Sequence, residues 1–358
     1  MKVGIITQPL IINYGGILQN YAMQQVLKRS GHTAITLNYM PSLSFGRYIL
    51  YVGKAIVCVP FPSLRHAIKP YKHFRERPIQ TKSFVANNIS ITKPIPKFTR
   101  HLLKKNRIDA ILLGSDQVWR YKFSHYYWED MFLAFAKHYH CRKIAYGASF
   151  GVEEWDCPQE LKIKARKLVK QFDYVSVRED SGMDICRREL GVEAVTVLDP
   201  TLLLNAKDYE QFCYPSNPNE SPYLAAYVLD MNDEKSEYIR TFAEKKGLKV
   251  KLMTISDNKV PVEEWLSTIK NAEYVITDSY HGSIFSIIFQ RQFYTFINKK
   301  RGSDRFYSLF RKLNLQSRLI EKKIQIPDDN DGIDYYAVYE ELKKLREESL
   351  SFLLSSLS

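Results

Sequence analysis

The stretch Asp278-Ser-Tyr-His-Gly-Ser283 lies between two apolar runs, Tyr274-Val-Ile-Thr277 before it and Ile284 to Phe289 after it. The first run is short and β-branched, which predicts a buried strand, and the second predicts a helix that begins after Ser283. His281 is the only histidine beyond residue 140. Ligands of open α/β sheets bind beyond the carboxyl ends of strands, where a helix N-terminus offers N–H groups to an anion. His281 is therefore a candidate functional residue, with a structural loop histidine as the alternative.

The composition sets limits on the class of protein. The 358-residue chain is long enough for two domains, and its formal net charge of +13 favours anionic partners without choosing among phosphorylated molecules, nucleic acid and acidic membranes. Its 5 cysteines form no CxxC pair, and the histidines show no HExxH spacing, so we expect neither a disulfide framework nor a metal site. With no signal peptide recognised and no apolar stretch long enough to span a bilayer, we expect a cytoplasmic location.

Short apolar runs alternate with helical patterns in two series, joined by a Pro-, Ser- and Asn-rich linker at 215–222. This predicts an α/β fold with two Rossmann-like domains facing a central cleft. The N-terminal domain is expected over 1–214 and the C-terminal domain over 223–330. A C-terminal helix within 331–358 could pack back on the first domain.

Residues 41–80 interrupt this alternation and form an insertion in the first domain. An apolar and aromatic segment, 48–59, precedes a basic run that contains Arg65, His66, Lys69, Lys72, His73, Arg75 and Arg77. This combination is typical of a segment in peripheral contact with the inner membrane surface. A core helix followed by a solvated loop is the alternative that we favour, and both interpretations stay open.

Polar residues gather where the predicted strands end. They are Asn13, Tyr14, Gly15 and Gly16 after the first strand, Ser115, Asp116, Gln117 and Trp119 after the third, Arg178 after the fifth, and Asp278 to Ser283, Arg301 and Arg305 in the second domain. The set contains a histidine, a carboxylate, several arginines and a helix N-terminus. Arginine binds carboxylates and phosphates with two parallel hydrogen bonds. The cleft is therefore expected to suit a small acid that carries phosphate.

Five segments in this order and spacing carry a resemblance to a known family: Asn13-Tyr-Gly-Gly-Ile-Leu-Gln-Asn-Tyr-Ala22, Gly114-Ser-Asp-Gln-Val-Trp119, Ser176-Val-Arg-Glu-Asp-Ser181, Val197-Leu-Asp-Pro-Thr201 and Thr277-Asp-Ser-Tyr-His-Gly-Ser283. The chain resembles the polysaccharide pyruvyl transferase family over nearly its whole length. The resemblance implies a fold like that of the B-type glycosyltransferases. It also implies transfer of a pyruvyl group from phosphoenolpyruvate, as co-substrate, to a sugar of a polysaccharide or its lipid-linked precursor, forming a ketal and releasing phosphate. Neither a cofactor nor a metal is expected.

The resemblance also implies that the domain at 1–214 is the acceptor side and the domain at 223–330 the donor side, and it implies roles for single residues. Arg178 and His281 match a family arginine and histidine at the donor site, and the full expected donor set is Arg178, Ser279, His281, Gly282, Ser283, Arg301 and Arg305. Many members have arginine where this chain has Ser279, and Arg301 or Arg305 could replace that cation. His281 is the expected acid, because histidine titrates near neutral pH. Asp116 is the candidate that deprotonates or hydrogen-bonds an acceptor hydroxyl, with a turn-capping role as the alternative. The expected acceptor set is Asn13, Tyr14, Gly15, Gly16, Ser115, Asp116, Gln117 and Trp119.

Two other functions remain compatible with the residues. A nucleotide-sugar-dependent glycosyltransferase of the same architecture could hold a diphosphate at the same helix N-terminus. A non-catalytic protein that binds acidic glycans or a membrane surface would use the positive charge and the 48–77 region instead. Nucleic-acid binding is the weakest alternative, because the basic residues are scattered and no known nucleic-acid-binding motif occurs. The oligomeric state is not assigned.

Overall fold

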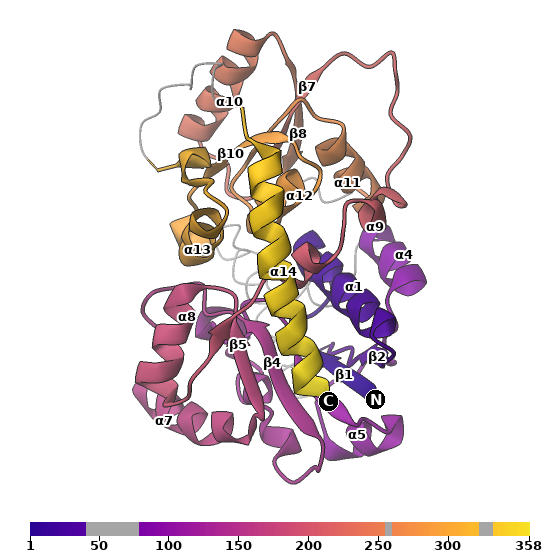
Figure 1. Ribbon diagram of the computed structural model, residues 1–358, viewed down its shortest axis with the longest axis vertical. Coiled ribbons are helices and arrows are strands. Elements are labelled where there is room, and N and C mark those ends of the chain that lie inside the picture. The colour runs from indigo at the N-terminus through magenta and orange to yellow at the C-terminus, as the bar shows by residue number, and fades with distance from the viewer. Residues whose placement is uncertain (41–78, 255–259, 322–331) are drawn as a thin grey trace, which may run out of the picture.

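The computed structural model describes residues 1–40, 79–254, 260–321 and 332–358, which form two α/β domains joined side by side (Figure 1). Most of the predicted insertion at 41–80 lies outside the described residues, so its two interpretations stay open. The first sheet contains β1 (Lys2–Ile6), β2 (Thr33–Thr36), β3 (Ala110–Leu113), β4 (Arg142–Ala148), β5 (Tyr174–Val177) and β6 (Val195–Thr196). The second contains β7 (Tyr223–Val228), β8 (Lys249–Thr254), β9 (Tyr274–Thr277), β10 (Gln292–Phe296) and β11 (Leu319–Ile320).

Helices cover both sheets. Those of the first domain are α1 (Tyr14–Arg29), α4 (Ile79–Asn88), α5 (Arg100–Asn106), α6 (Tyr121–Ser124), α7 (Gln159–Leu168), α8 (Asp180–Ile185) and α9 (Lys207–Glu210). Those of the second are α10 (Asp233–Lys246), α11 (Val262–Lys270), α12 (Tyr280–Ile288) and α13 (Asp304–Lys312), and α14 (Tyr335–Leu357) ends the chain. Every strand pair within the described residues is parallel, and strands of parallel sheets covered on both faces have continuous apolar runs.

The two sheets have the same connectivity, and this places the site. The strand order is β2-β1-β3-β4-β5-β6 in the first domain and β11-β10-β9-β7-β8 in the second. The order therefore reverses between β1 and β3, and again between β7 and β9. Loops at such switch points diverge and leave a crevice at the carboxyl edge of the sheet. The segments after β1, β3 and β9 are those in which the sequence predicted Asn13 to Gly16, Ser115 to Gln117 and His281.

The domains share one apolar core. Buried side chains of α1, α11, α12 and α14 belong to a single cluster that contains Ile17, Leu266, Phe285 and Leu353. Helix α14 runs along both domains (Figure 1). Near its start, the Tyr335 hydroxyl donates a hydrogen bond to the backbone oxygen of Ser286 at 3.3 Å. Further along, Ser349 Oγ accepts a 2.9 Å hydrogen bond from the Leu198 backbone.

Helix α12 begins earlier than the sequence predicted. It starts at Tyr280 rather than after Ser283, because Ser279 is the N-cap residue and its hydroxyl accepts a hydrogen bond from Gly282 N–H at 3.3 Å. The predicted start was wrong because it followed the apolar run, which begins at Ile284, and placed the cap at Gly282 and Ser283 instead of at Ser279. Gly282 is instead needed inside the helix, since a Cβ there would lie 2.4 Å from the Thr277 hydroxyl. His281 is thus the second residue of the helix.

Replacing Leu353 with alanine tests how strongly α14 is held. Leu353 is 0% exposed, whereas its neighbour Leu354 is 43% exposed, so Leu354→Ala is a matched control. We expect Leu353→Ala to destabilise the protein by about 2–5 kcal/mol, because it leaves a cavity in the shared core. The control is expected to cost less than about 0.5 kcal/mol. Urea unfolding measures both changes, and equal shifts in midpoint would contradict the packing of α14.

Candidate active site

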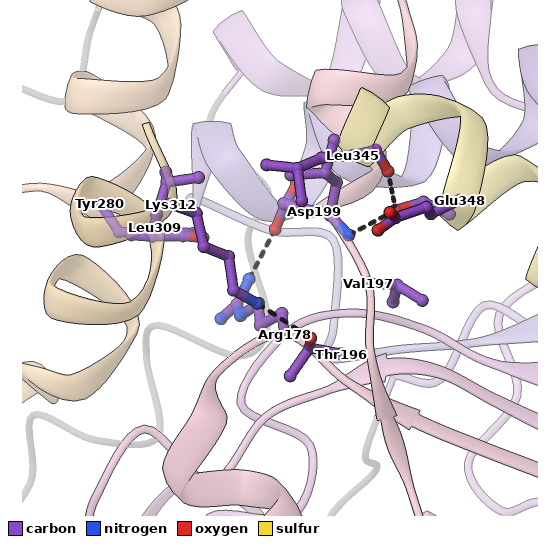
Figure 2. Close-up of a pocket in the computed structure, with 11 residues that line it drawn as sticks. Arg178, Thr196, Val197, Asp199, Tyr280, Leu309, Lys312, Leu345 and Glu348 are labelled. Carbon is purple, nitrogen blue, oxygen red and sulfur yellow. Dashed lines mark hydrogen bonds and ion pairs between the residues drawn. The ribbon is translucent and has the colours of Figure 1, made fainter. Parts of the chain in front are cut away.

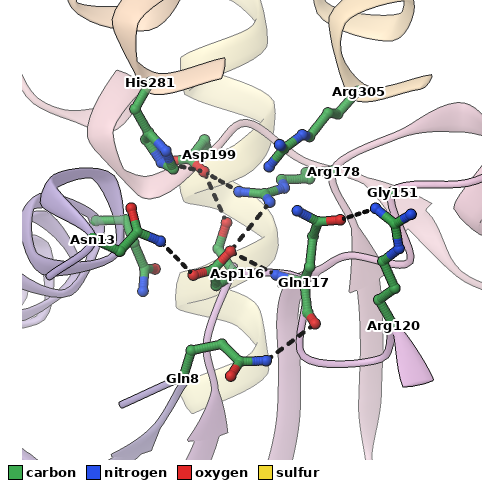
Figure 3. A network of polar contacts seen from close by, with 12 residues as sticks. Gln8, Asn13, Asp116, Gln117, Arg120, Gly151, Arg178, Asp199, His281 and Arg305 are labelled. Carbon is green, nitrogen blue, oxygen red and sulfur yellow. Dashed lines mark hydrogen bonds and ion pairs between the residues drawn. The ribbon is translucent and has the colours of Figure 1, made fainter. Parts of the chain in front are cut away.

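The carboxylate of Asp199 is the centre of the polar network at the domain boundary (Figure 3). Its Oδ1 accepts hydrogen bonds from Thr201 N–H at 3.1 Å and from the Thr201 hydroxyl at 2.7 Å. Its Oδ2 accepts from the Ser115 hydroxyl at 3.2 Å and from Arg178 Nη1 at 2.6 Å. His281 Nε2 lies 3.6 Å from the same oxygen. One carboxylate therefore joins residues that follow β3, β5 and β6 to a histidine of the second domain.

The surrounding charges keep Asp199 ionised although it is buried. Burial raises the pKa of this carboxyl, but His281, Arg178 and Thr201 together hold the pKa well below its usual range. Asp116 lies beside the same arginine, with Oδ1 3.7 Å from Arg178 Nη2. Asn13 donates a 3.2 Å hydrogen bond to the other oxygen of Asp116. Arg178 is thus flanked by two carboxylates at the edge of the first sheet.

A second arginine approaches Arg178 from α13. The guanidinium carbons of Arg178 and Arg305 both lie over the ring of Tyr280, each 5.0 Å from its centroid. The two side chains point toward one another in Figure 3. Burial, and then the positive charge of Arg178, lower the pKa of Arg305 to about 10. The face of an aromatic ring attracts cations, so Tyr280 partly offsets the repulsion between them.

Several N–H groups here have no partner. Among the described residues, Arg178 Nε and Nη2, Arg305 Nε and His281 Nε2 are buried without a hydrogen-bond acceptor. No carboxylate of the described residues lies within ion-pair distance, 4.0 Å, of Arg305. Arg178 Nη2, Arg178 Nε and His281 Nε2 face carboxylate oxygens at 3.7, 3.9 and 3.6 Å, beyond hydrogen-bond distance, so Arg305 is the cation here without an ion-pair partner. A buried charge without a counterion is costly. The group is therefore suited to an anion.

Gly15 fixes where the His281 ring can lie. A Cβ at Gly15 would fall 1.9 Å from His281 Nδ1, so the ring packs directly on the backbone at the start of α1. A Cβ at Gly16 would come within 3.3 Å of Asp116 Oδ2. The glycine pair thus admits a side chain of the second domain on one side and a carboxylate of its own domain on the other. This explains why both positions need a residue without a side chain.

Some residues of the predicted acceptor set lie in the network. Asn13, Ser115 and Asp116 belong to it as described above, and Gln117 extends it. Gln117 N–H donates to Asp116 Oδ1 at 2.7 Å, and its Oε1 accepts from Arg120 Nη1 at 2.9 Å. The Asp116 carboxylate therefore also caps its own turn, which was the alternative role predicted for it.

Two aromatic residues of that set pack elsewhere. Trp119 is 0% exposed, stacks on Phe132 with centroids 5.4 Å apart, and belongs to the core of the first domain. Tyr14 stacks on Trp265 at 5.4 Å and donates a hydrogen bond to the Val260 backbone oxygen at 2.6 Å. The structure does not bring these rings into the polar network. Tyr14 instead joins the two domains.

Only some residues of the predicted donor set meet in the polar network. Arg301 forms a two-pronged ion pair with Asp230, at 2.7 and 3.1 Å, and so already has a partner. The Ser283 hydroxyl lies 2.8 Å from the Thr295 hydroxyl inside the second domain. Ser279 is occupied as the N-cap of α12. Arg178, His281 and Arg305 are the members of the set that converge.

Sequence reasoning did not single out Asp199 and Tyr280 as site residues. Asp199 stands in one of the segments that carried the resemblance, directly after a predicted strand and before a proline, and this position was an available signal. Tyr280 also stands in such a segment, but its role under Arg178 and Arg305 depends on contacts with other elements, which the sequence does not show.

The described structure is closed around these groups. A cavity of about 10 Å³ lies beside Arg178 and Asp199 (Figure 2), and it is lined by Arg178, Thr196, Val197, Leu198, Asp199, Tyr280, Leu309, Lys312, Leu345, Glu348 and Ser349. That volume holds roughly one water molecule. Among the described residues, no three His, Cys, Asp or Glu side chains converge to hold a metal. No helix in the described ranges is long and apolar enough to cross a membrane.

A family model described as polysaccharide pyruvyl transferase matches residues 13–300. The chain belongs to the polysaccharide pyruvyl transferase family. The resemblance expected from the sequence is thereby confirmed. Membership in this pyruvyl transferase family indicates a transferase enzyme with a polysaccharide-type acceptor. No curated protein sequence matches the chain significantly.

Solved structures show the fold of this pyruvyl transferase family member. The N-terminal domain of Candida albicans trehalose-6-phosphate phosphatase is 10% identical with a TM-score of 0.54, covering 99% of this chain and 96% of that one. The S. aureus protein MnaA, solved with UDP, is 11% identical with a TM-score of 0.51, covering 100% and 92%. UDP-GlcNAc 2-epimerase from Methanocaldococcus jannaschii is 14% identical with a TM-score of 0.48, covering 97% and 100%. The first two, with the paired parallel sheets, confirm two Rossmann-like domains of the B-type glycosyltransferase kind.

Replacing Asp199 with asparagine tests the ion pair. Because the folded-state pKa of Asp199 is lowered, its stabilising effect is present above the unfolded value of about 3.9 and disappears as the pH falls through the folded value. We expect Asp199→Asn to cost about 3 kcal/mol or more at neutral pH, since it leaves Arg178 less compensated. The difference from wild type should shrink below about pH 4. Urea unfolding across pH measures it, with exposed Asp184→Asn as the control. A cost independent of pH would refute the pairing.

Proposed function

We propose that the protein transfers a pyruvyl group from phosphoenolpyruvate to a sugar of a polysaccharide or its lipid-linked precursor. The products are a pyruvate ketal and phosphate. The observation that carries the proposal is the convergence of Arg178 and Arg305, with unpaired buried N–H groups, beside His281. Phosphoenolpyruvate carries a carboxylate and a phosphate, and two guanidinium groups suit two such anions.

Arg305 is the proposed substitute for the arginine that many members carry at the position of Ser279. Arg301, the other candidate, is engaged by Asp230. Arg305 reaches the site from α13, where its guanidinium lies over the Tyr280 ring and the positive charge of Arg178 acts on it. The T-shaped contact of Tyr280 with Phe306, centroids 5.5 Å apart, holds the ring on which Arg305 rests.

The proposed chemistry requires an acid at the methylene carbon. His281 donates a proton to that carbon, which becomes a methyl group, and positive charge develops on the carbon that bears the phosphate. Two hydroxyls of one sugar then bond to that carbon, and the bond between the carbon and the bridging phosphate oxygen breaks. Of their two protons, one balances the proton gained by the methyl group and the other leaves with phosphate. Asp116 is the proposed acceptor of a hydroxyl proton.

The remaining residues hold these groups in place. Arg178 and Arg305 bind the donor anions and stabilise the charge that shifts to the departing phosphate. Asp199 fixes Arg178 through the 2.6 Å ion pair and faces His281 Nε2. The close packing of the His281 ring on Gly15 sets its position relative to the first domain. The scheme uses phosphoenolpyruvate as co-substrate and no further cofactor.

Product analysis tests the reaction. The protein is incubated with phosphoenolpyruvate and glycan precursors from the producing cells, and mass spectrometry is used to find a sugar that has gained one pyruvyl ketal. We expect this product together with phosphate release, and we expect His281→Gln to abolish both by removing the acid, a loss of about 10²-fold or more. Turnover of nucleotide-sugars instead would favour a glycosyltransferase. Near-normal turnover by His281→Gln would remove His281 from the chemistry.

Donor affinity tests the role of Arg305. We expect Arg305→Gln to weaken binding of phosphoenolpyruvate by about tenfold or more, because a charge-assisted hydrogen bond is lost. Arg240→Gln removes the same charge from an exposed position on α10 and serves as the control, with unchanged affinity expected. Titration calorimetry with phosphoenolpyruvate gives both values. Equal affinities for wild type and Arg305→Gln would show that Arg305 does not bind the donor.

A further inference from the structure

Unpaired buried polar atoms are concentrated at the domain boundary. The described residues contain 14 buried side-chain nitrogen or oxygen atoms without a hydrogen-bond partner, and 8 of them belong to residues of one boundary group: Arg120, Arg178, Glu179, Ser181, His281, Asp304 and Arg305. Native structures leave few such atoms unpaired, and clusters of them call for an explanation. Three members, Arg178, His281 and Arg305, are the proposed donor site. The other four are not explained by it.

These four residues differ in chemistry from the donor site. Their unpaired atoms are Arg120 Nε, Glu179 Oε2, Ser181 Oγ and Asp304 Oδ2, which include one cationic donor, two carboxylate oxygens and one hydroxyl. Arg120 is 5% exposed, Glu179 0% and Asp304 7%. A second anion would be repelled by two carboxylates. A hydroxyl group donates and accepts at once, so neighbouring hydroxyls can satisfy all four.

The four residues are neighbours in space. A Cβ on Gly302 would lie 3.1 Å from Arg120 Nη1 and 2.2 Å from the backbone oxygen of Gly151, whose N–H binds Glu179. Arg120 Nε lies 3.9 Å from Asp156 Oδ2, and the charges of Asp304 and Glu179 also act on Arg120. Burial raises the pKa of Asp304, and the Ser181 hydroxyl beside it lowers that pKa. Arg120 comes from the loop after β3 and Asp304 from the start of α13, so the group spans both domains. Arg120 Nη2 also reaches the Lys300 backbone oxygen at 3.4 Å.

Two residues of this group are sequence neighbours of donor-site residues. Glu179 directly follows Arg178, and Asp304 directly precedes Arg305. Each pair sends a cation to the donor site and a carboxylate to the second group. Gln117 connects the two, since its Oε1 accepts from Arg120 while its backbone N–H donates to Asp116, as Figure 3 shows. A ligand in the second group would therefore lie next to the donor and to the proposed base.

We propose that Arg120, Glu179, Ser181 and Asp304 form the subsite that binds hydroxyl groups of the acceptor sugar. The proposal rests on the proposed pyruvyl transfer and adds the acceptor-binding residues to it. Glu179 is held for this role, because its Oε1 accepts hydrogen bonds from Phe150 and Gly151 N–H at 2.7 and 2.9 Å while Oε2, 3.9 Å from Arg178 Nε, accepts none. Sugar hydroxyls bound here would contact both domains and would lie next to the donor.

The test separates sugar binding from donor binding. Methyl glycosides of glucose, galactose and mannose are titrated into the protein and followed by saturation-transfer NMR, with inorganic phosphate in place of phosphoenolpyruvate to prevent turnover. Calorimetry measures phosphoenolpyruvate affinity separately. We expect at least one glycoside to bind wild type, and Asp304→Asn and Ser181→Ala to weaken it about tenfold, as for lost hydrogen bonds to charged groups. Phosphoenolpyruvate affinity is expected to change less than about twofold.

Asp184→Asn, an exposed change on the same helix as Ser181, is the control and should alter neither affinity. Unchanged sugar binding in both variants, or no glycoside binding to wild type, overturns the subsite. Loss of phosphoenolpyruvate affinity along with sugar affinity also overturns it, since the residues would then shape the donor site. Failure of wild type to bind phosphoenolpyruvate, with sugar binding intact and sensitive to the two variants, contradicts the donor and leaves the subsite standing.

Discussion

The ion pair between the Asp199 carboxylate and Arg178 is the interaction on which the other groups depend. Both side chains are fully removed from solvent, and neither charge could remain there alone without a cost of several kcal/mol. Ser115 and Thr201 complete the hydrogen bonding of Asp199, which also faces His281. Because these partners come from different strand ends and from both domains, correct folding of each sheet is needed before any of them is placed.

The second notable interaction is repulsive. The positive charge of Arg178 adds to burial in lowering the pKa of Arg305, and the Tyr280 ring offsets part of this by lying under both guanidinium groups. An arrangement of this kind is least stable when empty and gains most from a bound anion. A bound anion would reduce the repulsion between the two guanidinium groups, and this gain in free energy would add to that of the hydrogen bonds it forms.

The sequence was sufficient to predict the sheets and the meeting of Arg178, Asp116, His281 and Arg305 at one boundary. Strand β9 agrees with its prediction at both ends, because a short apolar run bounded by polar residues leaves little choice. The sequence could not place side chains that depend on another domain. Trp119 resembles a ligand-binding residue until its stacking on Phe132 is known, and Tyr280 acquires its position only from α13 and Arg178. The start of α12 was missed because the apolar run begins only at Ile284, whereas the N-cap that sets the start is Ser279.

Helix α14 has a mechanical consequence for the closed boundary. His281, Arg178 and Arg305 are at most 6% exposed, so a polysaccharide reaches them only if the domains separate. The chain passes between the domains at the 215–222 linker and again through α14, whose first turn is bound to Ser286 and whose later turns are bound to Leu198. Helix α14 is thus held by hydrogen bonds in both domains, and its length is fixed by its own backbone hydrogen bonds. An opening that keeps both contacts must therefore turn the domains relative to α14 and cannot slide them apart along it.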